Sequence, residues 1–60
     1  MTSNKLNQDI ESLELVLDIT QYYSKNSFLS NKLRNRLEDC CFQLEIVIDD
    51  LNDFNETLEN

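Results

Sequence analysis

The sequence predicts an all-α fold, an antiparallel hairpin of two amphipathic helices. The chain has 60 residues and contains neither Gly nor Pro, so tight β-hairpin turns lack the residues that usually form them. Apolar residues recur at alternating spacings of three and four, which is the repeat of one helix face. A polar cluster at residues 24–27 interrupts this repeat. Two helices joined by one short loop become antiparallel neighbours.

The first helix is predicted over about residues 3–24. Its apolar stripe follows the helical repeat and consists of Leu6, Ile10, Leu13, Leu17 and Thr20. Thr2 and Ser3 are suitable N-caps, because their hydroxyl oxygens can accept a backbone N–H of the first turn. A polar loop is expected over about residues 25–28, and Ser27 or Ser30 would cap the next helix.

The second helix is predicted over about residues 29–58 and carries the stronger pattern. Its stripe keeps the alternating spacing without interruption: Leu33, Leu37, Cys40, Leu44, Val47, Leu51, Phe54 and Leu58. Such a stripe is typical of bundle and coiled-coil helices that pack side by side. Counting back from the loop pairs Leu17 with Leu37. We therefore expect Leu51, Phe54 and Leu58 to extend beyond the first helix with no intrachain partner.

The length of the chain makes a lone hairpin marginal. Residues 1–60 form a single domain, and a chain of this size buries only about 60% of its unfolded surface. Small scaffolds usually need a disulfide, a metal or an oligomeric partner. Cys40 and Cys41 are adjacent and cannot bridge each other within a helix, and there is no His. We expect the hairpin to complete a four-helix bundle, either as a homodimer or with another protein.

Both predicted helices carry apolar residues outside the main stripe. Exposed apolar residues are common when they are scattered, but a contiguous patch usually marks an interface. Because several of these residues recur at helical spacing, we expect a patch. The predicted partner-binding residues are Leu15, Ile19, Tyr22, Phe42, Ile46, Leu51, Phe54 and Leu58.

The net charge of −7 is unevenly distributed. From Leu37 to the end of the chain there are acids and no base. In a hairpin, the bases gather at the loop end and the acids at the terminal end. A twofold antiparallel dimer would place opposite charges side by side. The predicted complementary residues are Lys32, Arg34 and Arg36 on one copy, with Asp49, Asp50, Asp53 and Glu56 on the other.

The residues that support catalysis are missing from the sequence. Without His, a cysteine nucleophile lacks its usual base, and no glycine-rich loop can form. Carboxylate pairs such as Glu45 with Asp49 lack a rigid oxygen cage for a cation. We expect no enzyme activity, no cofactor and no metal. The negative charge disfavours direct nucleic-acid binding, and the absence of a signal peptide or long apolar run predicts a cytoplasmic protein with no membrane contact.

These features favour a small non-enzymatic protein–protein interaction module, such as an adaptor, a co-chaperone or a subunit, that binds through apolar helix faces. The alternative is an acidic inhibitor whose carboxylates mimic nucleic acid and occupy the basic site of a target protein. Its support is the acidic run that follows Leu37. Salt distinguishes the two, because it screens charge pairs and does not weaken apolar packing.

Overall fold

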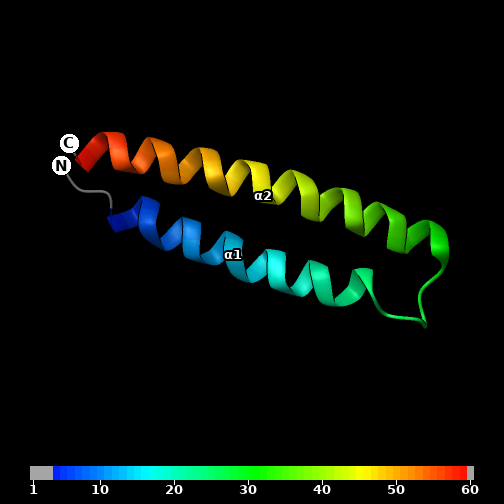
Figure 1. The fold of residues 1–60 in the computed structure, drawn as a ribbon. Helices are drawn as coiled ribbons and strands as arrows, with labels where there is room; N and C mark the ends of the chain where they lie inside the picture. The colour runs from blue at the N-terminus through cyan, green and yellow to red at the C-terminus, as the bar shows by residue number, and fades with distance from the viewer. Residues whose placement is uncertain (1–3, 60) are drawn as a thin grey trace.

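The computed structural model describes residues 4–59. They form two helices, α1 (Asn4–Ser24) and α2 (Asn31–Glu59), joined by a loop at residues 25–30. The helices pack against each other as an antiparallel hairpin about 45 Å long (Figure 1). This confirms the predicted all-α helical hairpin. Neither helix of the described chain is long and apolar enough to cross a membrane.

The loop is longer than predicted, because α2 begins at Asn31 and not near residue 29. Ser30 caps α2, since its hydroxyl oxygen accepts the backbone N–H of Leu33 at 3.2 Å. The side-chain oxygen of Asn26 accepts the N–H of Phe28 at 2.9 Å, an arrangement that favours a turn over a helix. The predicted caps of the first helix, Thr2 and Ser3, lie outside the described residues.

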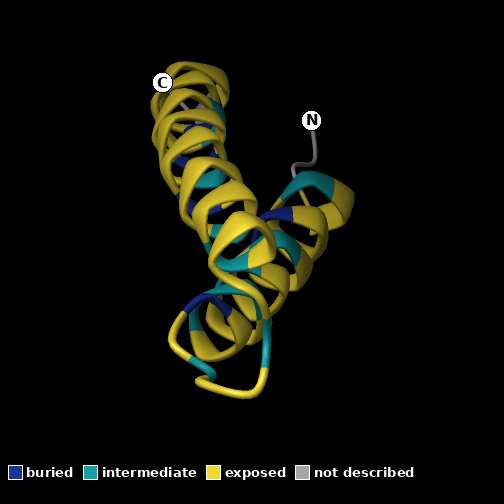
Figure 2. Ribbon diagram, turned by 90° about the vertical axis from the view of Figure 1, so that its right-hand side faces the viewer, coloured by how far each residue is buried: buried dark blue, intermediate teal, exposed yellow. Residues whose placement is uncertain are grey.

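The two helices meet along an intrachain seam. On α1 the inward residues are those of the predicted stripe, continued by Ser24. On α2 the inward residues are Arg34, Leu37, Cys41, Leu44, Ile48, Leu51 and Asn55. In Figure 2 the buried and half-buried positions follow the facing sides of the helices, and the outer surfaces are exposed. The most buried apolar residues are Ile10, Cys41 and Ile48.

The seam on α2 is rotated from the predicted stripe. Cys40, Val47 and Phe54 were expected to face inward, and all three are exposed. Their successors in the chain, Cys41, Ile48 and Asn55, are buried instead. The predicted stripe and the observed seam share Leu37, Leu44 and Leu51, and both follow the helical repeat. Periodicity alone therefore does not distinguish them.

Two polar contacts set the register of α1 on α2. Near the chain termini, the amide nitrogen of Asn55 donates a hydrogen bond to the side-chain oxygen of Asn7 at 2.5 Å. Near the loop, the hydroxyl of Ser24 lies against the thiol of Cys41. Small polar groups thus meet small polar groups at both ends of the seam. The apolar residues of the two helices are left to pack between them.

The predicted overhang at the chain termini is wrong. Figure 1 shows the start of α1 beside the last turns of α2, and Leu51 is half-buried in the seam. The Asn7–Asn55 and Ser24–Cys41 contacts place Leu17 near the level of Ile48, not of Leu37. The cause is the loop, which continues past the end of α1 before α2 begins. Because α2 has 29 residues and α1 has 21, most of its surplus length lies at the loop end.

The Asn7–Asn55 contact predicts opposite effects for substitutions of its two partners. Asn55 is 9% exposed, and its side-chain oxygen is buried without a hydrogen-bond partner. An unsatisfied buried group costs about 1–3 kcal/mol. We expect Asn55→Leu to raise the melting temperature, by about 4–8 °C for each kcal/mol gained. Asn7→Ala should lower it, because the amide of Asn55 then loses its acceptor. Circular dichroism melts in which Asn55→Leu is the more damaging change would contradict this.

The seam also predicts the outcome of one substitution made at two neighbouring sites. Ile48 is buried, whereas Ile46 is on the outer face of α2. Ile48→Ala should destabilise the hairpin by about 2–5 kcal/mol through the lost packing. Ile46→Ala should change the stability by no more than about 0.5 kcal/mol. Urea unfolding of both variants measures the difference, and equal effects would show that the seam is placed wrongly.

Candidate interaction surface

An uncovered apolar row runs beside the intrachain seam on α2. It consists of Leu33, Cys40, Val47 and Phe54, which recur every seven residues. All four are exposed, and the exposed fraction is 43% for Leu33, 45% for Val47 and 55% for Phe54. Residues that recur every seven positions keep a constant direction along a supercoiled helix pair. The row is therefore an apolar ridge that keeps one direction along α2, with one residue about every 10.5 Å.

Two residues of α1 extend this ridge into a wider surface. Val16 and Tyr23 directly precede inward residues, as the four row residues of α2 do, and both are exposed. In an antiparallel pair, residues that precede inward positions on the two helices lie on the same side of the hairpin. We call this surface the open apolar side. It consists of Val16, Tyr23, Leu33, Cys40, Val47 and Phe54.

The opposite side of the hairpin is acidic. Glu14, Glu38 and Glu45 each directly follow an inward leucine, and all three are exposed. By the same antiparallel geometry they share one side. The side that carries Val47 and Phe54 is therefore the more apolar of the two, although Lys5, Asp9 and Ser12 at the start of α1 also precede inward residues and lie on it. This difference in polarity is between two sides of the helix pair. It is separate from the difference in burial between the inner and outer face of each helix.

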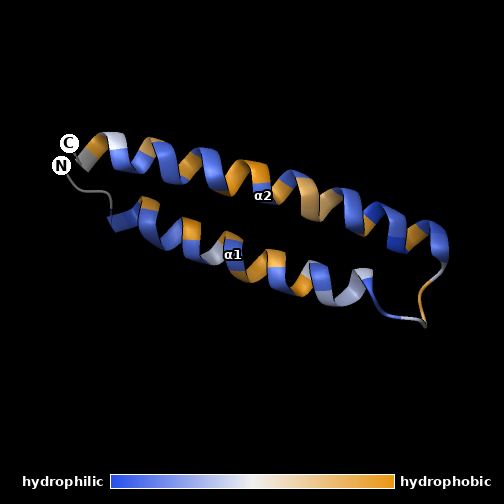
Figure 3. Ribbon diagram, in the orientation of Figure 1, coloured by the Kyte–Doolittle hydropathy of each residue, from blue (hydrophilic) through white to orange (hydrophobic). Residues whose placement is uncertain are grey.

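The predicted partner-binding residues fall on several surfaces. On α1, Leu15 and Tyr22 are exposed on the outer face. Ile19 is exposed and directly precedes the inward Thr20, so it lies along the outer edge of the open apolar side. The rings of Tyr22 and Tyr23 meet edge to face, with centroids 5.1 Å apart. Bands of apolar residues recur along both helices in Figure 3.

The predicted partner-binding residues of α2 are separated by the fold. Phe54 belongs to the open apolar side, and Leu58 is exposed near the chain termini. Phe42 and Ile46 are exposed on the outer face of α2, away from the open apolar side. Leu51 lies in the intrachain seam. The predicted set is therefore not a single surface.

Five of the six residues of the open apolar side, all except Phe54, were not among the predicted partner-binding residues. Leu33, Cys40 and Val47 were assigned to the stripe that packs against the first helix, and they are exposed. The available signal was that α2 carries two overlapping stripes. One helix can cover only one of them, so the other was available to a second partner.

The predicted charge-complementary residues are also divided by the fold. Arg34 lies on the seam line, half-buried, and donates a hydrogen bond to Asn31. The other residues of the set are exposed. Only Arg36 and Asp50 directly precede inward leucines, which places them along the outer edge of the open apolar side. Within residues 4–59 the one ion pair is Lys5–Asp9, at 3.2 Å.

The two cysteines have different environments, although both are free thiols. Cys40 is exposed on the open apolar side and Cys41 is buried in the seam. Burial raises the pKa of the Cys41 thiol, and the nearby Cys40 and Glu45 raise it further. The hydroxyl of Ser24 partly opposes this rise. Cys41 is thus held as a neutral thiol, which suits a packing role.

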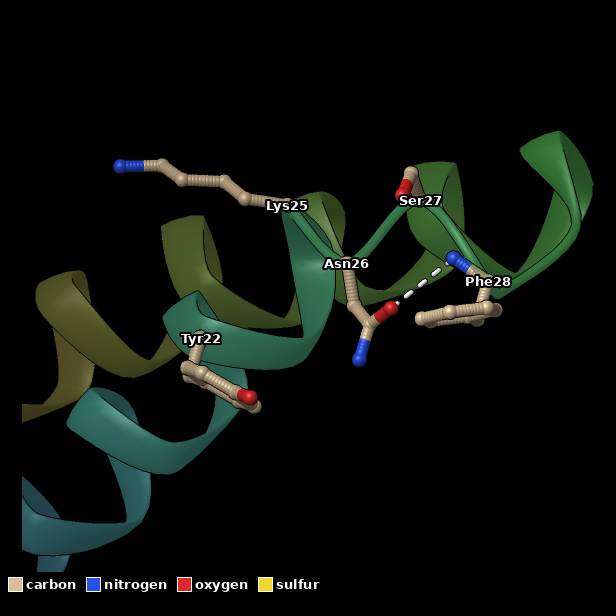
Figure 4. Close-up of a pocket in the computed structure, with 5 residues that line it drawn as sticks. All are labelled: Tyr22, Lys25, Asn26, Ser27 and Phe28. Carbon is tan, nitrogen blue, oxygen red and sulfur yellow. Dashed lines mark hydrogen bonds between the residues drawn. The ribbon is translucent and has the colours of Figure 1, made fainter.

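A shallow hollow lies at the loop between the two helices. It has a volume of about 440 Å³ and is open to solvent. Figure 4 shows its five lining residues, Tyr22, Lys25, Asn26, Ser27 and Phe28. Phe28 is 96% exposed. A hollow this open excludes no water, and residues 4–59 contain no cluster of three or more potential metal ligands.

Comparison of the chain with family models, curated proteins and solved structures found no match. Function is therefore inferred from the surfaces of the hairpin.

The environments of the two thiols predict unequal reactivity. In a Cys41→Ala variant, the remaining Cys40 should react readily with a thiol reagent when the chain is dilute. In a Cys40→Ser variant, the remaining Cys41 should react slowly, because it is buried and its pKa is raised. Denaturant should make the two rates converge. Equal rates in the folded variants would contradict the observed seam.

Proposed function

We propose that this chain is a small non-enzymatic protein–protein interaction module that binds a helical partner through its open apolar side. The observation that supports this is the exposed row on α2, which is apolar at every seventh residue. Such spacing suits the packing of another helix, whose side chains fit between successive row residues. A long uncovered apolar surface usually marks an interface.

The size of the hairpin supports the same proposal. Among the described residues no large side chain is fully buried, so the intrachain seam alone gives a thin core. Covering apolar surface contributes about 25 cal/mol for each Å² removed from water. A partner on the open apolar side would therefore stabilise the hairpin as it binds. An adaptor, a co-chaperone and a subunit all work in this way.

A second candidate is an acidic inhibitor that occupies a basic, nucleic-acid-binding site of a target. The observation that favours it is the exposure of the acids of α2 between Glu38 and Glu56. No ion pair to these acids is present within the described residues. Affinity would then come from charge, and the open apolar side would have no part in it.

A pull-down with two matched double variants separates these candidates. Val47→Gln with Phe54→Gln removes apolar surface from the open side, and Asp49→Asn with Glu56→Gln removes two exposed charges. We expect the first variant to lose the proteins that the unmodified chain captures, and the second to keep them. Capture should also persist in about 1 M salt, where exposed charges are screened within about 3 Å.

The opposite result would support the acidic inhibitor: capture lost with the charge variant and in high salt, and kept with the apolar variant. Circular dichroism spectra of both variants serve as the control for folding. All four substitutions lie at exposed positions, where effects on stability are usually small. If both variants kept every captured protein, the open apolar side would have no binding role.

A further inference from the structure

We infer that the partner of the open apolar side is a second copy of this chain, docked antiparallel about a twofold axis near the level of Ile19 and Gln43. This inference rests on the proposed function and names its partner. It depends on three symmetries in the exposed residues, which come from different helices and from different kinds of side chain.

The first symmetry is in the exposed apolar patch of α1. Leu15 and Val16 precede Ile19 by four and three residues, and Tyr22 and Tyr23 follow it by three and four. The patch is therefore centred on Ile19 and occupies only the second half of α1. A helix that packs antiparallel on its own copy about Ile19 places each half of this patch on the other half.

The second symmetry is in the apolar row of α2. Its inner pair, Cys40 and Val47, and its outer pair, Leu33 and Phe54, share one midpoint between residues 43 and 44. An antiparallel copy centred there places Cys40 near Val47 of the second copy. Likewise it places Leu33 near Phe54 of the second copy. All four residues are exposed in the hairpin.

The third symmetry is one of charge. Arg36 and Asp50 stand seven residues before and after Gln43, and all three lie on the outer edge of the open apolar side. In the antiparallel arrangement, Arg36 meets Asp50 of the second copy, and the twofold axis repeats this pair. A shift of seven residues along the apolar row keeps three of its four contacts and loses both charge pairs. Charge thus selects one register among those that apolar packing allows.

The two centres coincide within the hairpin. The Asn7–Asn55 and Ser24–Cys41 contacts place Ile19 and Gln43 at nearly the same level along the rod. One twofold axis through that level therefore pairs α1 with α1 and α2 with α2 simultaneously. Measured over the Cα atoms, the long face of the rod is 45 by 15 Å. The area of this face is of the same order as the roughly 800 Å² that each partner buries in a standard interface.

The first test is the mass of the purified chain by size exclusion with light scattering at tens of micromolar. We expect a mass of twice 7.1 kDa. A monomer would overturn this inference. In that case, capture of another protein that depends on Val47 and Phe54 would leave the proposed function standing. A monomer whose captures ignore those residues would overturn both.

Chemical crosslinking tests the axis and the register. In a background of Cys40→Ser and Cys41→Ala, Gln43→Cys should crosslink between copies with a short bifunctional maleimide, because the two positions face each other across the axis. Arg36→Cys alone should not, since its two positions lie about 21 Å apart along α2, from fourteen residues at 1.5 Å each. A mixture of Arg36→Cys and Asp50→Cys chains should crosslink. A dimer with any other pattern would overturn the proposed arrangement.

A charge reversal tests the pairing at positions that do not contribute to the intrachain seam. Arg36→Asp should weaken dimerisation about tenfold, given about 0–1 kcal/mol for each exposed pair and two such pairs. Adding Asp50→Arg to the same chain should restore the dimer, because both contacts are then reversed together. Reversal of Asp53, outside the proposed edge, serves as the control. Failure of the second change to restore the dimer would show that Arg36 and Asp50 do not meet.

Discussion

The structure depends on which of two overlapping stripes of α2 is covered by α1. A single neighbouring helix contacts one stripe, and α2 has two that share Leu37, Leu44 and Leu51. The Asn7–Asn55 hydrogen bond and the Ser24–Cys41 contact commit α1 to the stripe that contains polar residues. A buried Asn can specify register in this way at a cost in stability. The more apolar row is consequently left exposed.

Much of this fold could be predicted from the sequence. The part that could not be predicted is the pairing of residues between the two helices. The helical spacing of Ile10, Leu13 and Leu17 identifies the inward face of α1, because α1 has one strong stripe. For α2, composition favours the row that contains Val47 over the seam that contains Asn55. Only the match between Asn55 and its partner on α1 reverses this preference. Such a contact depends on residues of both helices, so it cannot be predicted from the periodicity of one helix.

The register could not be predicted for a related reason. Counting residues back from the loop assumes that α2 starts beside the end of α1. The side chains of Asn26 and Ser30 instead form a turn and a cap that delay α2 until it is past that end. The residues involved are visible in the sequence, but their effect on register depends on the direction in which the loop leaves α1. The direction of the loop therefore also determines which side of the hairpin is left exposed.

The charge layout of α2 is unfavourable for an isolated helix. Its first turns carry Lys32 and Arg36, and its last turns carry Asp53 and Glu56, so like charge meets each end of the helix dipole. Each such placement costs a few tenths of a kcal/mol, up to about 1. A second α2 that runs in the opposite direction would bring acids to the positive end and bases to the negative end. The layout is thus costly for the hairpin alone and favourable for the antiparallel pair that we propose.

The shared leucines link the folding of the hairpin to its association. Leu37, Leu44 and Leu51 are only half-buried in the hairpin, and each lies between two residues of the exposed row along α2. Covering that row would complete their burial, and the free energy gained would stabilise the intrachain seam together with the interface. Substitutions at these leucines should therefore weaken both contacts, whereas Val47 and Phe54 contribute to association alone. In a chain this short, the same side chains supply the core of the monomer and the core of the assembly.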